Sequence, residues 1–457
     1  MGPNSYGGMS LAPRKRATWG GHAPLVAVAL WLFLWVNLDT GFWLIVMPQT
    51  LEDWVSLIRA CLPFLVLPIS AFILIRKDTL RLPGIAPSRL LLIYGILAAI
   101  SGVFSPEPLW AAYWSVTYLA TILTAWTFID ERSPVESART MLLVTWVFTF
   151  IVAAYLAHAS SGLIFGHSAS MYNRPEAGLD KLSRSSGIAR WAAVPGLVCV
   201  VRAFYTKRRL LIAGLLGAAC FCFFLIYRMQ SRGAVFGYFG ALIFILLLAG
   251  RMRRYALPFV IFATILLFLI ESPGVVYDNV FEYLRRGQSE ELFESMSGRT
   301  RAYEHGVVAF QAAPVFGRGQ WTDRLVIFEH VHNSFLQALL NAGIVGGLPY
   351  FASWIAGWIM YFRLRNKWRW LSAEERVCLL ESGTVMMFFT IRAIPETTTA
   401  SYAVDLLVMV AVYVYIETLT SDVARRQAAA LRASQFVAPA RPNDIPSRQL
   451  AQAFERR

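Results

Sequence analysis

Long apolar runs recur along almost the whole chain, and they constrain its fold more than any other feature. A helix that crosses a hydrocarbon core of about 30 Å needs about 20 predominantly apolar residues. Such runs follow one another from residue 24 to residue 418. Only 15% of the residues are charged and 57% are hydrophobic, whereas a soluble domain carries about 25% charged residues. We therefore expect an all-α integral membrane protein with about 12 transmembrane helices.

The positions of the runs divide the chain into three parts. Residues 1–23 form a basic N-terminus, residues 24–418 the transmembrane domain, and residues 419–457 a tail. The predicted spans cover residues 24–47, 54–75, 88–104, 108–129, 138–157, 189–205, 209–227, 233–250, 255–274, 335–362, 376–394 and 401–418. The tail is rich in Ala, Arg, Pro and Gln, so we expect one or two helical turns followed by disorder.

Basic residues are concentrated in alternate loops, which predicts the orientation of the chain. Cytoplasmic loops of membrane proteins carry an excess of Lys and Arg. Here the basic clusters lie at residues 14–16, 76–77, 207–209, 251–254, 363–369 and 425–426. Both termini are therefore predicted to be cytoplasmic, with long external loops at residues 158–188 and 272–331, the second before the tenth span. The net charge of +14 follows from this bias, so no nucleic-acid partner is expected.

Arginines gather at the predicted outer face. Guanidinium groups bind phosphate oxygens through two parallel hydrogen bonds, so an outer cluster suits a lipid-linked diphosphate. Alternatively, the arginines bind lipid headgroups or pair with carboxylates such as Glu396. The candidate arginines are Arg184, Arg190, Arg228, Arg232, Arg299, Arg301 and Arg392.

A histidine precedes the tenth span in the segment Glu329-His-Val-His332-Asn333-Ser334. Asn333 or Ser334 is suited to cap the helix that begins there. His332 would then lie at a helix N-terminus, where the helix dipole disfavours the imidazolium and leaves a neutral base. The alternative is an interfacial histidine that bonds a backbone carbonyl.

Motifs for cofactors and metals are lacking. The sequence contains no phosphate-binding Walker loop, no Gly-rich dinucleotide turn and no His-Glu-x-x-His. The external pair Glu52-Asp53 resembles, weakly, the acidic motif of metal-dependent lipid-linked glycosyltransferases. A lone acidic pair in a tight loop more often marks a helix start, so no metal and no cofactor are predicted.

Residues 299–349 resemble the signature region of the O-antigen ligase and O-antigen polymerase superfamily of bacterial membrane glycosyltransferases. Ser231-Arg232-Gly233 is similar to the family's external arginine motif, and the histidine-to-glycine spacing fits its pattern of ten intervening residues. Two features depart from the family: Tyr303 stands where tryptophan is common, and residues 184–191 follow the pattern of the first loop only loosely. The matching elements are Ser297-Gly298-Arg299, Pro314, Gly317, Gly319, His332 to Leu336, Gly343 and Gly346.

The resemblance implies a function and a set of site residues. A glycan carried on undecaprenyl diphosphate is transferred to an acceptor hydroxyl at the periplasmic face of the inner membrane, with inversion and without a metal. His332, Arg232 and Arg299 are the implied catalytic residues. The implied substrate-binding residues are Arg184, Arg190, Arg228, Arg301, Arg392, Asn333 and Glu396.

The acceptor distinguishes two versions of this function. A polymerase of exopolysaccharide or O-antigen adds to a growing polymer, and we favour it because residues 392–399 and Asp405 are similar to exopolysaccharide polymerases. A ligase of lipopolysaccharide biosynthesis transfers to lipid A core. Chain-length regulators and export proteins are further expected partners, besides the lipid bilayer. The rival from another class is a transporter or lipid-linked sugar flippase, for which Glu381 inside a span is the main argument.

Overall fold

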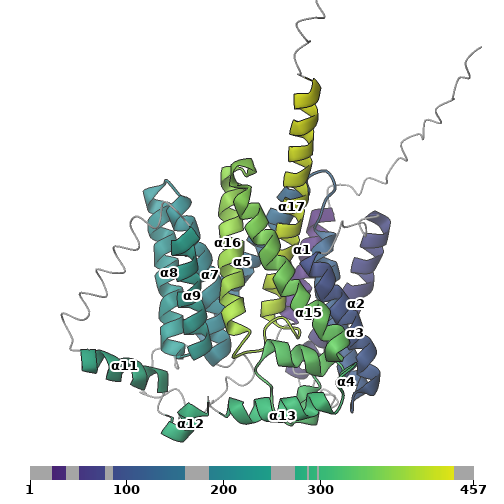
Figure 1. Ribbon diagram of the computed structural model, residues 1–457, viewed down its shortest axis with the longest axis vertical. Coiled ribbons are helices and arrows are strands. Elements are labelled where there is room, and N and C mark those ends of the chain that lie inside the picture. Colours follow the sequence, from purple (N-terminus) through teal and green to yellow (C-terminus); the bar gives the residue numbers. More distant parts are fainter. Residues whose placement is uncertain are drawn as a thin grey trace, which may run out of the picture.

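The computed structural model describes residues 23–37, 51–77, 86–159, 185–248, 273–285, 288–295 and 298–436. These residues form helices and connecting loops, and no strand occurs among them. Figure 1 shows the long helices packed side by side along the long axis of the molecule. They are α1 (Ala23–Val36), α2 (Leu51–Lys77), α3 (Pro87–Ser101), α4 (Pro108–Thr127), α5 (Pro134–Ala159), α7 (Ser185–Tyr205), α8 (Arg209–Met229), α9 (Arg232–Leu248), α15 (Ser334–Asn366), α16 (Ala373–Arg392) and α17 (Val404–Phe436).

Many of these helices meet the requirements for crossing a membrane. Within the described part of the chain, seven are long and apolar enough, in α2, α3, α5, α7, α8, α15 and α17, and two shorter apolar helices lie in α1 and α9. The prediction of an all-α integral membrane protein is confirmed. The span at 255–274 lies outside the described residues, so the count of twelve stays a prediction.

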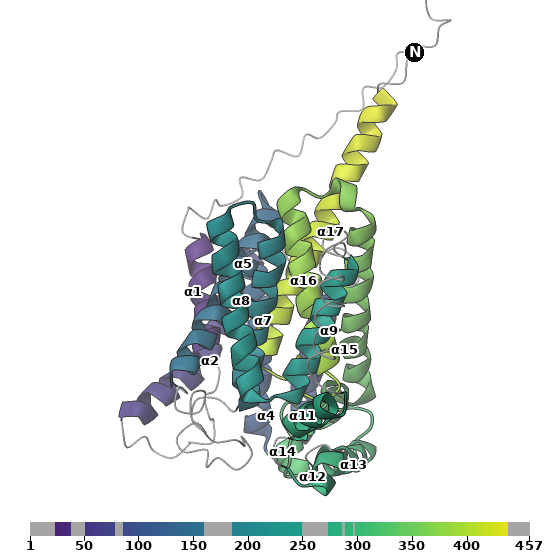
Figure 2. The same ribbon diagram turned by 90° about the vertical axis from the view of Figure 1, so that its left-hand side faces the viewer.

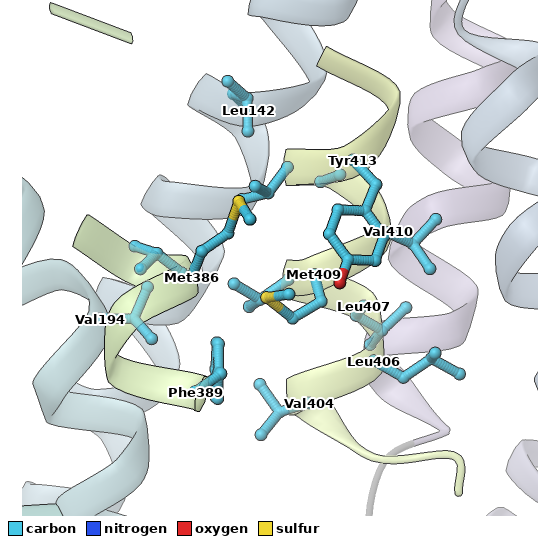
Figure 3. Packing of buried hydrophobic residues seen from close by; sticks show 14 of the residues in the cluster. Leu142, Val194, Met386, Phe389, Val404, Leu406, Leu407, Met409, Val410 and Tyr413 are labelled. Atoms are coloured by element: carbon cyan, nitrogen blue, oxygen red, sulfur yellow. The ribbon is translucent and has the colours of Figure 1, made fainter. Parts of the chain in front are cut away.

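Helix α17 is the centre of the bundle. All its residues from Val404 to Glu417 are buried, which explains why this stretch reads as a continuous apolar run without helical periodicity. Figure 3 shows side chains of the neighbouring helices against it, including Leu142 of α5, Val194 of α7 and Phe389 of α16. The loop between α16 and α17 is thereby held at one end of the bundle.

The end of α17 differs from the prediction. We expected one or two turns beyond residue 418, but α17 continues without interruption to Phe436 and projects past the other helices (Figure 1). Arg426 binds Glu375 with a 2.6 Å separation, and Lys367 donates to Gln427 at 2.7 Å. These contacts, together with a run of alanines that favours helix, extend the helix. Residues 437–457 lie outside the described part.

A reversal inside α15 brings its N-terminus back into the bundle. Gly343 has φ +59° and ψ −161°, which breaks the helix into two arms. The two arms fold against each other, and the ring of Phe335 in the first arm lies 5.5 Å from that of Phe351 in the second. A Cβ at Gly343 would lie 2.1 Å from the carbonyl oxygen of Val315. Only glycine fits this conformation and this close approach. The reversal therefore requires a glycine at position 343, with ten residues between it and His332, which immediately precedes the first arm.

Short helices cover the end of the bundle where α15 begins. They are α11 (Pro273–Arg285), α12 (Glu290–Glu294), α13 (Arg299–Gln311) and α14 (Asp323–Val326), and they occupy much of the segment predicted as a long loop. Figure 2 shows them at the end opposite to the projecting part of α17. A small apolar cluster joins α13 and α14 to α15, and its buried members are Ala309, Ile327, Val331 and Leu340. Single 3₁₀ turns lie at Gly102–Phe104 and Trp368–Trp370.

Candidate active site

The start of α15 is fixed to the loop that joins α16 and α17. The backbone N–H of Ser334 donates to the carbonyl oxygen of Ala393 at 3.0 Å, and its hydroxyl lies 2.7 Å from that of Thr398. Asn333 is the N-cap, since its side-chain oxygen accepts from the N–H groups of Phe335 and Leu336. Two segments more than 60 residues apart thus meet at one point.

His332 lies immediately before this cap in a strained conformation. Its φ is +46°, in the left-handed region that residues with a Cβ rarely adopt. The hydroxyl of Tyr303 donates to the carbonyl oxygen of His332 at 3.2 Å, so tyrosine supplies a donor at the position where the family often has tryptophan. Strained residues held by their surroundings are frequent at functional sites.

Glu396 links His332 to Arg299. The Nδ1 atom of His332 lies 3.3 Å from Oε2 of Glu396, and Oε1 of the same carboxyl accepts from Arg299 at 2.6 Å. Arg299 also donates to the carbonyl oxygen of Pro395 at 2.6 Å. Gly298 has φ +82° and precedes the first residue of α13, so glycine permits the turn that directs Arg299 to this carboxyl.

The protonation states within this group follow from burial and charge. Burial lowers the pKa of the His332 imidazole below its ordinary value, although the hydrogen bond to Glu396 acts in the opposite direction. Burial alone would raise the pKa of the Glu396 carboxyl, but the hydrogen bond with His332 and the charges of Arg299 and Arg392 outweigh it and hold that pKa far below its usual range. The arrangement favours a neutral imidazole beside an ionised carboxylate.

A second group of charged residues adjoins the group formed by His332, Glu396 and Arg299. Asp405, at the start of α17, is fully buried between Arg190 at 3.4 Å and Arg392 at 3.6 Å. Arg392 is only 2% exposed, and it interacts electrostatically with Glu396. Buried charges are costly unless they are paired, so these residues form one connected set with Glu396.

The start of α9, at Arg232, adjoins Glu396. Arg232 is the first residue of that helix, and a Cβ at the following Gly233 would lie 3.7 Å from Cγ of Glu396. The Arg232 guanidinium donates to the side-chain oxygen of Gln288 at 2.6 Å and lies 5.0 Å from the ring of Phe293. The helix start thus brings a cation, and the partial positive charge of the helix N-terminus, toward the site.

A second histidine adjoins His332. The ring of His330 lies 4.6 Å from that of His332, and its Nδ1 is 2.7 Å from Oδ2 of the fully buried Asp323. Burial alone would raise the pKa of the Asp323 carboxyl, but His330, Arg324 and the backbone N–H of Val331 together outweigh it, and the pKa is lowered. The indole of Trp321 stacks on the ring of His330, with 5.3 Å between the ring centres.

Comparison with known protein families gives one match, which includes part of this site. Residues 197–351 match a family model described as O-antigen ligase. This match supports the resemblance to the O-antigen ligase and polymerase superfamily. No curated protein matches the chain.

The matched segment covers about a third of the chain, from within α7 to within α15. It contains Arg228, Arg232, Arg299 and His332, whereas Glu396 and the other members of the α16–α17 loop lie outside it. The match and the apolar helices together support a multi-pass membrane protein with a domain of this type.

The structure groups some of the predicted site residues and separates others. His332, Arg299, Glu396, Arg232, Arg392 and Arg190 lie together, directly or through Asp405. Arg301 is 71% exposed and pairs with Glu329 at 3.5 Å. Arg228 lies in the last turn of α8, and Arg184 lies outside the described residues. The alternative in which an arginine pairs with Glu396 applies to Arg299.

One explanation made from the sequence needs correction. Burial, rather than the helix dipole, is the leading cause of the lowered His332 pKa. Asn333 caps α15 with its side-chain oxygen, as predicted, and its side-chain N–H donates to the carbonyl oxygen of Ile394; its contact with substrate stays a prediction.

Other candidates do not assemble into a site. Among the described residues, no group of three or more His, Cys, Asp or Glu could hold a metal ion, and the side chains of Glu52 and Asp53 lie outside them. Glu381 binds Arg202 with a 2.6 Å separation and accepts from Trp146 at 3.1 Å.

Some residues near the site could not be identified from sequence reasoning. The pair of Asp323 and His330 could not be identified, because a seven-residue spacing between an aspartate and a histidine does not by itself indicate a contact. Asp405 was noted for its resemblance alone, since nothing in the sequence shows that two arginines flank it.

Proposed function

We propose that this protein transfers a glycan from undecaprenyl diphosphate to a sugar hydroxyl at the periplasmic face of the inner membrane, as a polymerase of exopolysaccharide or O-antigen. The continuous contact from His332 through Glu396 to Arg299 carries the proposal. It joins a neutral base to a cation of the kind that binds diphosphates.

The base acts through Nε2 of His332. When its Nδ1–H donates to Glu396, the imidazole keeps a lone pair on Nε2. Nε2 takes the proton from the acceptor hydroxyl as that oxygen bonds to the anomeric carbon. The bond from this carbon to the diphosphate oxygen breaks, its electron pair leaves with the diphosphate, and the configuration inverts. Glu396 stabilises the imidazolium that forms.

The arginines act on the leaving group. Arg190, Arg232, Arg299 and Arg392 supply four positive charges, while Glu396 and Asp405 supply two negative ones. The set retains two positive charges, which suits a diphosphate whose negative charge grows as it leaves. Removing one fixed donor to a developing charge typically raises the barrier by about 3–4 kcal/mol. In the proposed reaction the arginines stabilise this charge, and no metal takes part. The diphosphate would displace Gln288 from Arg232.

An apolar groove beside the site suits the lipid part of the donor. It has a volume of about 520 Å³, begins at Phe335, and follows the lipid-facing side of α15 next to Thr390 of α16. Its lining is mostly aromatic and aliphatic, with Trp354, Trp358 and Phe362 along its length and Arg363 and Asn366 at its far end. Phe335 is three residues from His332, so an isoprenoid chain in this groove would hold its diphosphate near the arginines.

The distribution of charge supports a periplasmic site. The site lies at the end covered by α11–α14 (Figure 2). The opposite end carries Arg363, Arg365 and Lys367 at the end of α15, together with Arg425 and Arg426 of α17. Because cytoplasmic ends are enriched in Lys and Arg, the site faces the other side.

The test is transfer by the purified protein and by cells. A strain lacking the gene supplies lipid-linked glycan, and mild acid releases from it an oligosaccharide that accepts but does not donate. We expect His332→Ala to lose about 10²–10⁴-fold in rate while lipid-linked glycan still binds. Arg232→Lys should also be impaired, because lysine keeps the charge but loses the forked pair of hydrogen bonds.

His305→Ala is the matched control, since His305 is an exposed histidine on α13. Equal protein amounts in the membrane exclude misfolding. Normal transfer by a well-expressed His332→Ala variant would contradict the proposal. Transfer to lipid A core instead of the released oligosaccharide would identify the ligase version.

A further inference from the structure

The side of His332 away from the arginines carries a second histidine–carboxylate pair. His330 and His332 each present Nδ1 to a carboxylate, Asp323 at 2.7 Å and Glu396 at 3.3 Å. With both Nδ1 positions occupied, the Nε2 atoms are the remaining binding atoms of the two rings. The rings are 4.6 Å apart, so both are within reach of one sugar.

The position of His330 is fixed from several directions. Oδ2 of Asp323 binds its Nδ1 and also accepts the backbone N–H of Val331 at 3.2 Å. Trp321 stacks on the ring, and Trp321 itself is held by Trp110, whose indole N–H donates to its carbonyl oxygen at 3.1 Å. Trp321 has φ +59°. A strained backbone and a buried carboxylate thus hold one partly exposed imidazole.

The two sides of His332 differ in their surroundings. Arg299 and Glu396 lie on one side, whereas His330 on the other is flanked by the rings of His332 and Trp321. The charges near His330 belong to Asp323, which binds it, and to Arg324, whose guanidinium lies 4.6 Å from the Trp321 ring. Ligand sites that are mostly aromatic with a few placed polar groups suit uncharged, partly apolar ligands. The diphosphate belongs on the arginine side, which leaves the His330 side for a neutral sugar.

We propose that His330, positioned by Asp323, binds a second hydroxyl of the acceptor sugar and so presents the attacking hydroxyl to His332. This inference rests on the proposed function and adds the acceptor site to it. His330 binds the acceptor, whereas His332 removes its proton. Loss of His330 should therefore change the acceptor dependence, and loss of His332 the rate of transfer.

The experiment measures initial transfer rates with purified full-length protein. Lipid-linked glycan from the deletion strain is the donor, and the acceptor is the released oligosaccharide or lipid A core, whichever the wild-type protein uses. We expect His330→Ala to raise the half-saturating acceptor concentration about tenfold, as loss of one well-made hydrogen bond does. The half-saturating donor concentration should not change.

Asp323→Asn provides the test of positioning. It should raise the half-saturating acceptor concentration as His330→Ala does, and the double variant should show no further increase, because both changes remove one contact. Additive effects would mean that Asp323 acts elsewhere. A general loss of rate with a lowered melting temperature in both single variants would mean that the pair is structural.

Other outcomes separate this inference from the proposed function. An unchanged acceptor dependence in an active His330→Ala variant would overturn the acceptor site and leave His332 as the base. Wild-type activity in His332→Ala would overturn the proposed function itself. His305→Ala is again the control and should change neither substrate dependence.

Discussion

At the scale of single residues, the proposed chemistry depends on how Glu396 acts on His332. The Glu396 side chain forms hydrogen bonds with both His332 and Arg299. Its charge raises the pKa of His332 while burial lowers it. The carboxylate therefore keeps the imidazole a stronger base than its buried position alone would allow.

The pH dependence of transfer tests this relation. The base must be neutral, so the rate should rise with pH through the pKa of His332, which lies below the ordinary value of about 6.5. In Glu396→Gln the raising influence is lost, so this acid limb should move to still lower pH. The weaker base should also reduce the plateau rate about tenfold or more. Initial rates between about pH 5 and pH 8 provide the measurement.

Unfolding does not account for such a limb. A carboxyl whose folded pKa is depressed contributes stability above its unfolded pKa, and this stability is lost as pH falls through the folded pKa. For Glu396 that loss lies well below the measured range. Glu329→Gln is the matched control, because Glu329 pairs with the exposed Arg301 away from His332. A limb that moved to higher pH in Glu396→Gln would refute the assigned role.

At the scale of elements, the two arms of α15 determine where His332 lies. The reversal requires a positive φ at Gly343 and leaves no room for a Cβ beside Val315. We expect Gly343→Ala to lower the melting temperature in detergent and to abolish transfer, since left-handed strain alone costs about 1–3 kcal/mol and the overlap adds to it.

The control for this change is Gly214→Ala in the middle of α8. A Cβ there would meet nothing within 4 Å, and alanine is the better helix former. Its melting temperature should equal or slightly exceed that of the wild type. If Gly343→Ala melted like Gly214→Ala and kept its activity, the reversal would not be needed to place His332.

The sequence revealed elements and motif residues better than their connections. Apolar runs predicted most helices, and a short motif was enough to select His332 and Arg299. The partnership of these residues with Glu396 depends on the loop between α16 and α17, which follows the motif by more than 60 residues. The length of α17 was underestimated, because contacts of its final turns with Glu375 and Lys367 are tertiary.

At the scale of the whole molecule, charge is divided between the two ends of the bundle. One end combines arginines with buried carboxylates and His332, and the other carries basic residues around the α15–α16 connection and on α17. The first end is suited to bind an anionic headgroup, and the basic residues of the second end are typical of the cytoplasmic side of a membrane protein. The groove along α15 extends from Phe335 near the first end to Arg363 and Asn366 near the second.

The last prediction concerns this orientation. Alkaline phosphatase, which is active only outside the cytoplasm, should be active when fused after Gln288, between α11 and α12, and inactive when fused after Asn366, at the end of α15. A fluorescent protein that folds only in the cytoplasm should give the reciprocal result, and a fusion after Phe436 should match Asn366, because α17 and α15 end on the same side (Figure 1). The reciprocal reporter also controls for unstable fusions, which would be silent with both. Phosphatase activity after Asn366 with none after Gln288 would invert the molecule and place the arginines and His332 in the cytoplasm. Transfer to a periplasmic acceptor would then be impossible, even if every contact at the site were correct.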